Sequence, residues 1–363
     1  KSRSRGLGDV YKRQIEYALK NNAKILLISH LGRPIEGEYE ESFSLKPVAK
    51  YLSKIVNEPC NVIDDLDSKS FFNKESNIQL LENIRFFEGE KANCKDLGAK
   101  LASLGDIYVF DAFGTAHREQ ASTHSAIECA PIACAGLLLQ RENKFLSLAL
   151  NNHESPYVAV IGGAKVSSKL ELIKHINSEA DHIIVGGGFA NTFLKAKGFD
   201  VGKSLFEDSM IDIAYNLIEK GKIILPKKVI TSTTFEGKNV KETLVSEVGH
   251  NEMILDLHLE EETVALLEDA KTILWNGPMG VFENIVFEKG TKDLSIAVAR
   301  SKAFSLAGGG ETLSAINKYI KSNDVSYCST GGGAFLEFME GKTLPSMEAV
   351  SYTHLTLPTM ELG

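Results

Sequence analysis

The sequence predicts an α/β protein of two domains, in which parallel β-sheets are wrapped by helices. From Ile15 onward, short apolar segments alternate with amphipathic helical stretches. The apolar segments are nearly continuous runs of Val, Ile and Leu, as in strands that are buried on both faces. At 363 residues the chain also exceeds what one hydrophobic core usually fills.

The expected strands are short runs of β-branched and other apolar residues that end in a turn or a charged residue. Three lie in the first half of the chain, at 24–29, 78–82 and 107–111, and six lie in the second half, at 157–161, 182–185, 222–225, 272–275, 304–307 and 327–329. Residues 135–151 are rich in Leu and Ala and are expected to form a helix that joins the two domains. The segment 151–156 ends that helix, which places the boundary near residue 153.

The two ends of the chain differ in character from the rest. KSRSRGLGDVYKRQ lacks the apolar core of a signal peptide, and neither it nor VSYTHLTLPTMELG continues the α/β pattern. One short DNA tag read in opposite directions encodes both 9–14 and 350–354, as in sequencing-adapter read-through. Residues 1–14 and 350–363 are therefore interpreted as foreign segments, which leaves domains at 15–152 and 153–349.

Composition restricts the class of partner. The net charge of −8 argues against general affinity for nucleic acid or anionic membranes. No apolar run reaches the roughly 20 residues of a membrane span. Five cysteines without C-x-x-C spacing indicate reduced thiols rather than a metal site, and hence a cytoplasmic protein.

Cations follow each strand of the first half. His30 and Arg33 follow the first strand, Arg85 follows the second, and His117 and Arg118 follow the third. Ligands of open α/β sheets lie beyond the carboxyl ends of the strands, so these side chains are expected to converge on a small polyanion. In the alternative interpretation, each arginine pairs with a nearby acid: Glu82, Glu88 or Asp111.

Glycine clusters follow four strands of the second half. Glycine lets the backbone approach a ligand closely, and an adjacent helix N-terminus offers free N–H groups to phosphate. The clusters are Gly162–Gly163, Gly186–Gly188, Gly308–Gly310 and Gly331–Gly333. Neither the dinucleotide pattern G-x-G-x-x-G nor a P-loop occurs among them. The missing dinucleotide pattern disfavours one hypothesis for the function, an NAD-dependent dehydrogenase.

Two lysines open a predicted helix after the first of these clusters. Lys165 and Lys169 stand four residues apart and are expected on one helical face, with Ser168 and Glu171 as a capping box. Cations oppose the dipole preference of a helix start, which suggests that they hold phosphate; exposed, solvated lysines are the alternative. Asn276 and Glu283 lie in a further post-strand loop whose carboxylate suits a ribose hydroxyl.

These segments together resemble the phosphoglycerate kinase family over nearly all of 15–349. The resemblance is carried by SHLGRP (29–34), LENIRF (81–86), DAFGTAHR (111–118), GGAKVSSKL (162–170), WNGPMGVFE (275–283), AGGGET (307–312) and STGGGAFLE (329–337). It implies two doubly wound parallel-sheet lobes joined by the interdomain helix and a hinge. It also implies a cytoplasmic, monomeric enzyme of glycolysis that transfers a phosphoryl group between 1,3-bisphosphoglycerate and ADP, giving 3-phosphoglycerate and ATP.

The resemblance also implies roles for individual residues. The first lobe would bind the phosphoglycerate through His30, Leu31, Gly32, Arg33, Arg85 and Arg118, and the second would bind the magnesium nucleotide. In the second lobe, the expected catalytic residues are Lys169, Lys165, Gly331 and Gly332. Lys169, Gly186, Gly187, Asn276, Glu283, Gly308, Gly309, Gly310, Glu311 and Thr312 would bind the nucleotide, with Glu311 also at the Mg²⁺.

The sequence departs from the family pattern in three places. Residues 1–14 lack the R-x-D-x-N strand and the following arginine, the segment after Ala349 differs, and Glu311 stands where many relatives carry Asp. These departures support an alternative function, a nucleotide-binding fragment without catalysis. The partners expected in either case are small molecules only.

Overall fold

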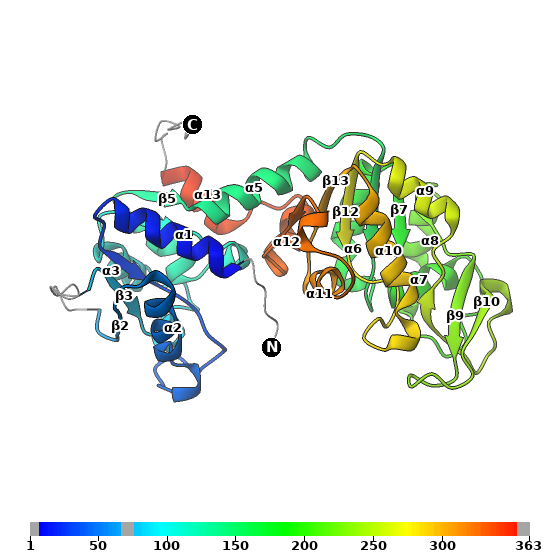
Figure 1. The fold of residues 1–363 in the computed structure, drawn as a ribbon, viewed down its shortest axis with the longest axis horizontal. Coiled ribbons are helices and arrows are strands. Elements are labelled where there is room, and N and C mark those ends of the chain that lie inside the picture. Colours follow the sequence, from blue (N-terminus) through cyan, green and yellow to red (C-terminus); the bar gives the residue numbers. More distant parts are fainter. Residues whose placement is uncertain (1–6, 67–75, 354–363) are drawn as a thin grey trace. The chain divides into compact units, whose positions relative to one another are not determined.

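The computed structural model describes residues 7–66 and 76–353, and the chain divides into two compact units. The first unit comprises Lys1–Arg141 and Thr343–Gly363, and the second comprises Glu142–Lys342. Both units combine helices with parallel sheets (Figure 1), which confirms the predicted fold class. The predicted domain boundaries, which give lobes at 15–152 and 153–349, remain a prediction.

The first unit contains a three-stranded parallel sheet and a separate parallel pair. The sheet has the order β1 (Ile25–Leu27), β3 (Ile78–Leu81), β2 (Cys60–Ile63), and the pair consists of β4 (Tyr108–Phe110) and β5 (Ala133–Ala135). All residues of β3 are buried, as expected of a central strand. The strands predicted at 24–29, 78–82 and 107–111 are confirmed, whereas β2 and β5 were not predicted.

Helices and short turns complete the first unit. They are α1 (Leu7–Lys20), α2 (Lys46–Val56), α3 (Lys95–Ser103), α4 (Ala126–Cys129) and α13 (Pro345–Thr353), with η1 (Glu41–Phe43), η2 (Ile84–Phe86), η3 (Phe113–Thr115) and η4 (Ala121–Ser125). Residues 7–14 and 350–353 are thus helical; the remainder of the two segments interpreted as foreign lies outside the described residues.

The helix α13 belongs to the first unit although it follows the second in sequence. The Ser346 N–H donates to the Ala116 carbonyl at 3.1 Å. Leu344 and Ala349 are 1% and 3% exposed, so the end of the chain supplies part of the first unit's apolar interior. The first unit is therefore built from two segments that are about 200 residues apart in sequence.

The second unit is built on a six-stranded parallel sheet. Its order is β14 (Tyr327–Cys328), β13 (Phe304–Ala307), β12 (Thr272–Asn276), β6 (Tyr157–Ile161), β7 (His182–Val185), β8 (Ile223–Ile224). All six predicted strands of this half are confirmed. The chain moves outward from β6 through β7 to β8 and then outward on the other side from β12 to β14. The strand order therefore reverses between β6 and β12, which is where open α/β sheets bind ligands.

Helices and turns connect these strands. They are α6 (Leu170–Glu179), α7 (Gly187–Ala196), α8 (Ile211–Ile218), α9 (Glu261–Asp269), α10 (Lys289–Arg300), α11 (Gly310–Tyr319) and α12 (Gly333–Met339), with η5 (Ser167–Lys169), η6 (Asp208–Met210), η7 (Val245–Glu247), η8 (Ile285–Phe287) and η9 (Ser322–Asp324). An antiparallel sheet in the order β10 (Lys241–Leu244), β9 (Lys228–Ser232), β11 (Met253–Leu257) was not predicted. Its edge strand β10 is mostly exposed and polar, so it carries little apolar signal.

The predicted joining helix is confirmed as α5 (Leu137–Leu150), and both units contribute residues to it. Glu142 in this helix has no exposed surface. Its carboxylate accepts hydrogen bonds from the Ser329 hydroxyl at 2.9 Å and from the Thr330 N–H and hydroxyl at 2.7 Å each. Burial raises the pKa of Glu142, and these hydrogen bonds oppose that shift. The carboxylate fixes the turn that leads from β14 into α12.

Among residues 7–66 and 76–353, no helix is both long and apolar enough to cross a membrane.

The Glu142 contacts predict a measurable loss of stability. Glu142→Ala leaves the polar groups of Ser329 and Thr330 without their acceptor, so the free energy of unfolding of the second unit should fall by about 3 kcal/mol. Urea denaturation followed by the fluorescence of Trp275, the single tryptophan, reports on this unit. The exposed Glu171, paired with Lys174 at 3.0 Å, provides the control. Glu171→Ala should cost less than about 0.5 kcal/mol, and equal losses in the two variants would contradict the assignment.

Candidate functional site

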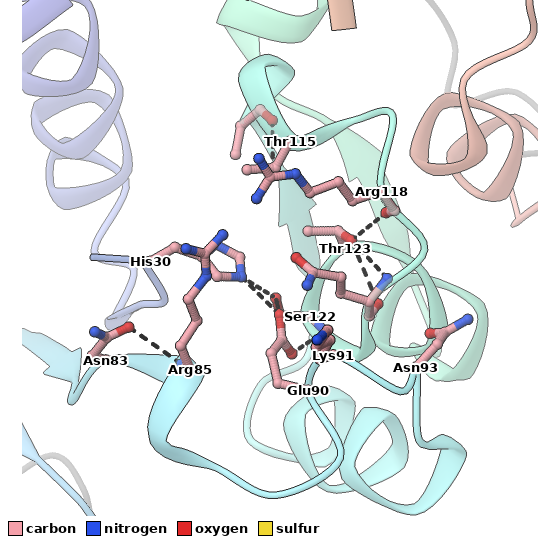
Figure 2. A network of polar contacts seen from close by, with 12 residues as sticks. His30, Asn83, Arg85, Glu90, Lys91, Asn93, Thr115, Arg118, Ser122 and Thr123 are labelled. Atoms are coloured by element: carbon pink, nitrogen blue, oxygen red, sulfur yellow. Dashed lines mark hydrogen bonds and ion pairs between the residues drawn. The ribbon is translucent and has the colours of Figure 1, made fainter. Parts of the chain in front are cut away.

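The predicted cations of the first unit lie in loops after its strands. His30 and Arg33 follow β1, with the predicted binding residues Leu31 and Gly32 between them. Arg85 lies in η2 after β3, and Arg118 follows η3 after β4. The side chains of Arg85 and Arg118 extend from different loops toward His30 (Figure 2). The Arg85 guanidinium donates to the Gly32 carbonyl, which joins two of these loops.

The arginines crowd one another electrostatically. Burial, together with the positive charges of Arg118 and Arg33, lowers the pKa of Arg85, while Glu90 acts in the opposite direction. Such mutual repulsion is relieved by an anion. We refer to Arg33, Arg85 and Arg118 as the arginine cluster.

The alternative, in which each arginine pairs with a nearby acid, is not found. Within the described part of the chain, no ion pair joins a carboxylate to the arginine cluster. Glu82 instead accepts from the Ser44 hydroxyl and the Leu45 N–H at 2.7 Å each, and Asp111 accepts from the Leu139 N–H at 2.8 Å. Burial raises the pKa of Asp111 to about 6. The guanidinium groups are thus available to an anionic ligand.

Glu90 is a member of this site that the sequence did not indicate. It has no exposed surface, and it accepts from His30 Nε2 at 2.7 Å and from the Ser122 hydroxyl at 2.6 Å (Figure 2). In the sequence, Glu90 lies in the polar segment FEGEK (87–91), in which the residue pattern does not distinguish it from Glu88. The signal available was its position five residues after Arg85, and this was not sufficient to single it out.

The second unit contains a cavity of about 220 Å³ at the carboxyl ends of its central strands. It is lined by Lys169, Asn276, Gly277, Gly309, Gly310, Glu311, Thr312, Gly332 and Leu336. Seven of the predicted residues are therefore brought together here: Lys169, Asn276, Gly309, Gly310, Glu311, Thr312 and Gly332. Because the sheet order reverses between β6 and β12, the cavity lies where this fold binds ligands.

Lys169 is the principal cation of this cavity. Its ammonium donates to the carbonyls of Gly162 at 2.5 Å and Asn276 at 3.0 Å. Burial lowers the pKa of Lys169 to about 8, and the negative charge of Glu311 partly opposes this shift. A phosphate in the cavity would compete with the two carbonyls and favour the charged ammonium.

The capping box predicted for this segment is wrong. The helix α6 begins at Leu170, after the 3₁₀ turn η5, so Lys165 and Lys169 both precede it. The Ser168 hydroxyl donates back to the Lys165 carbonyl at 2.7 Å and caps no helix. Lys165 is exposed and does not line the cavity.

Backbone contacts shape the floor of the cavity. A Cβ atom added to Gly162 would lie 2.0 Å from the Pro278 carbonyl oxygen, so only glycine fits where β6 ends against the loop after β12. Gly277 has φ of +120°, and a Cβ atom added to it would lie 2.4 Å from the Gly162 carbonyl oxygen. The Gly277 N–H donates to the Thr312 hydroxyl at 2.8 Å, and the Asn276 amide donates to the Gly308 carbonyl at 2.8 Å. These contacts bring the start of α11 against the loop after β12.

Several predicted residues lie beside the cavity rather than in its lining. Gly186 and Gly187 pack against the loop after β12, where the Gly187 N–H donates to the Met279 carbonyl at 2.7 Å. Gly308 is buried against Phe335, and the Gly331 N–H donates to the Ser329 hydroxyl at 3.2 Å. Glu283 is exposed. Their assignment as binding residues stays a prediction.

The metal-binding prediction concerns Glu311. The residues that the structure describes contain no group of three or more His, Cys, Asp or Glu side chains able to hold a metal ion. Glu311 is a single exposed carboxylate at the cavity. Mg²⁺ at nucleotide sites takes one or two carboxylates and otherwise phosphate oxygens and water, so this lining fits a cation that arrives with a nucleotide.

Comparison with known proteins identifies the family. The phosphoglycerate kinase family model matches residues 10–342. The phosphoglycerate kinase of Francisella tularensis subsp. novicida (strain U112) is 48% identical over 344 residues, covering 92% of this chain and 87% of that protein. Two solved structures each cover 94% of this chain and 89% of their own. They are the phosphoglycerate kinases of Coxiella burnetii (TM-score 0.88, 44% identity) and Pyrococcus horikoshii OT3 (TM-score 0.77, 30% identity).

The chain belongs to the phosphoglycerate kinase family, and it is a kinase of glycolysis. The alternative of a non-catalytic fragment gains no support from these matches, because they extend over most of this chain and of its relatives.

The closeness of Gly162 to the loop after β12 yields a prediction. Gly162→Ala should lower the free energy of unfolding of the second unit by about 3 kcal/mol, because the methyl group meets rigid backbone. Trp275 fluorescence during urea denaturation measures the loss. Gly249→Ala is the matched control in the same unit, since the nearest atoms to its methyl group would belong to the Glu252 side chain, at 3.2 Å, and not to backbone. A Gly162→Ala protein as stable as the Gly249→Ala protein would show that the approach is not tight.

Proposed function

We propose that this kinase transfers a phosphoryl group reversibly between 1,3-bisphosphoglycerate and ADP, giving 3-phosphoglycerate and ATP. The observation that carries the proposal is the arginine cluster: three guanidinium groups in adjoining loops, without an ion-paired carboxylate among the described residues. Such a cluster suits a small ligand with several negative charges, and a phosphoglycerate supplies a phosphate and a carboxylate.

The first unit is proposed to hold the phosphoglycerate. Arg33, Arg85 and Arg118 offer bidentate N–H groups. His30 adds a ring nitrogen, toward which Arg85 and Arg118 extend (Figure 2). Leu31 and Gly32 supply the backbone between His30 and Arg33, and the Asn83 side chain fixes this loop. That side chain accepts from the Leu31 N–H at 3.2 Å and donates to the Leu31 carbonyl at 2.7 Å. The backbone of Leu31 is therefore held in place by Asn83.

The second unit is proposed to hold the nucleotide. The α11 N-terminus, with Gly309, Gly310 and Thr312, offers N–H groups and a positive dipole end to phosphates, and Lys169 adds a charge. Asn276, Gly186, Gly187 and Gly308 shape the surrounding backbone, and Glu283 is proposed to bind the ribose. Gly331 and Gly332, before α12, are proposed to receive the moving phosphoryl group with Lys165 nearby.

The proposed chemistry requires no general base. When ATP is the donor, the acceptor is the carboxylate of 3-phosphoglycerate, which is ionised at neutral pH. The residues therefore only have to orient the reactants and neutralise charge on the phosphoryl oxygens. Lys169 and the N–H groups at Gly310 and Gly332 are suited to that task. Mg²⁺ bound with the nucleotide beside Glu311 would supply further positive charge to the phosphates.

Because the two ligands are assigned to different units, we propose that transfer requires the units to move, with α5 and the Ser329–Thr330 turn as hinge. Excluding water during transfer would protect the acyl phosphate from hydrolysis. The enzyme is proposed to act as a cytoplasmic monomer on small-molecule substrates.

The assignment of the first unit is tested by steady-state kinetics. The wild-type protein should transfer phosphate from MgATP to 3-phosphoglycerate. Arg33→Met should raise KM for 3-phosphoglycerate about 100-fold, because a charged bidentate contact is lost, and should leave KM for MgATP within about twofold. Arg300→Met, at an exposed helix end, is the control and should change neither constant. A wild-type protein without turnover would contradict the proposed function, and equal changes in both KM values would contradict the assigned site.

Lys169 predicts a pH dependence of nucleotide binding. The lysine with a pKa of about 8 loses its charge as pH rises through that value, so the Kd of MgADP should increase about tenfold from pH 7.5 to pH 9. Arginine stays charged over this range, so Lys169→Arg should give a nearly flat profile whatever its absolute affinity. Isothermal titration calorimetry measures both. The proposal fails if wild type and variant show the same slope.

A further inference from the structure

Resting on the proposed function of the arginine cluster, we propose that Glu90 is a positioning residue for 3-phosphoglycerate. In this proposal its buried carboxylate holds His30 in one ring orientation and ties the Arg118 loop to the same point. Glu90 itself would not touch the substrate.

The contacts of Glu90 use both carboxylate oxygens. Oε1 accepts from His30 Nε2 at 2.7 Å and from the Ser122 hydroxyl at 2.6 Å, and Oε2 accepts from the Ser122 N–H at 2.9 Å. An ionised carboxylate can only accept, so His30 Nε2 carries a hydrogen. This fixes the ring by its Nε2 edge and leaves Nδ1 as the nitrogen free to meet a ligand.

Glu90 connects three loops that are distant in sequence. His30 follows β1, Glu90 follows η2, and Ser122 lies in η4. The Ala121 N–H also donates to the Glu90 carbonyl at 2.9 Å. Next to Ser122, the Thr123 hydroxyl donates to the Arg118 carbonyl at 2.6 Å (Figure 2). A displacement of the Glu90 carboxylate would therefore be transmitted to both His30 and the backbone of Arg118.

The charge of Glu90 has a second effect. It is the carboxylate that acts on Arg85 against the repulsion of Arg33 and Arg118. A buried carboxylate costs free energy unless it is paired, and here hydrogen bonds from Ser122 and His30 provide that pairing. Because its oxygens are already occupied, Glu90 does not block the arginines. Glu90 therefore reduces the repulsion among the three arginines without occupying their N–H groups, as a direct ion pair would.

A purely structural role makes a different prediction. Glu82 is a carboxylate of similar burial whose oxygens, among residues 7–66 and 76–353, accept only from a hydroxyl and backbone N–H groups. Glu90, by contrast, accepts from a basic side chain of the proposed substrate site. If Glu90 served folding alone, its replacement would change stability and not the affinity for one substrate.

The principal test is Glu90→Gln, which keeps the shape and removes the charge. We expect KM for 3-phosphoglycerate to rise about tenfold, because the hydrogen bond from His30 loses its charge assistance. KM for MgATP should be unchanged, and kcat should fall by a smaller factor than KM rises. ¹⁵N NMR of the histidine side chains should show a protonated His30 Nε2 in the wild type, assigned by its absence in His30→Gln. In Glu90→Gln that signal should shift or exchange rapidly with solvent.

The hydroxyl of Ser122 provides a matched pair of variants. Ser122 and Ser125 are both buried in η4, but the Ser125 hydroxyl donates to Asn93 and not to Glu90. Ser122→Ala should raise KM for 3-phosphoglycerate, whereas Ser125→Ala should leave it unchanged. This pair keeps the proposal testable if Glu90→Gln does not fold.

Two results would overturn the proposal. One is a folded Glu90→Gln protein with wild-type KM for 3-phosphoglycerate and an unchanged His30 signal. The other is an equal effect of Ser122→Ala and Ser125→Ala on that KM. The NMR measurement needs no turnover, so a wild-type protein without kinase activity would contradict the proposed function and still leave the Glu90–His30 contact to be tested separately.

Discussion

The close approach of backbone at the ends of β6 and β12 is the constraint on which the second unit depends. Gly162 and Gly277 have no side chains, so the two strand ends meet and the loop after β12 turns toward α11. The Gly277 N–H then reaches Thr312, and the carbonyls of Gly162 and Asn276 reach the Lys169 ammonium. A methyl group at Gly162 would separate all of these groups. The reversal of strand order opens the cavity, and the two glycines determine what lines it.

The two units solve the problem of concentrated positive charge differently. In the second unit, Lys169 is desolvated and rests against carbonyl oxygens, and its pKa is lowered to about 8. In the first unit, arginines keep their charge because guanidinium is a very weak acid, and the repulsion among them is moderated by one buried carboxylate, Glu90. Lys169 in the second unit can change its charge state near neutral pH, whereas the arginines of the first unit present a constant charge to a ligand.

Much of this organisation is predictable from the sequence, because the strands of a parallel sheet are continuous apolar runs that end in distinctive turns. Residues 157–161 and 272–275 are examples, and the residues after them line the cavity. The strands β2 (CNVI) and β5 (ACA) lack such a signal, because one is interrupted by Asn61 and the other contains only Ala and Cys. The capping box at Ser168 failed because a 3₁₀ turn delays the start of α6. Glu90 could not be singled out because its partners His30 and Ser122 lie 60 and 32 residues away.

The return of α13 to the first unit affects the order in which the two units can complete their folding during synthesis on the ribosome. All residues of the second unit have been synthesised by Lys342, whereas the first unit still lacks Thr343 onward. The hydrogen bond from the Ser346 N–H to the Ala116 carbonyl cannot form until Ser346 has been translated, 230 residues after Ala116. The second unit can therefore complete its interior while the earlier-made first unit is still open. The apolar surface of the first unit that α13 covers stays exposed until α13 has been made.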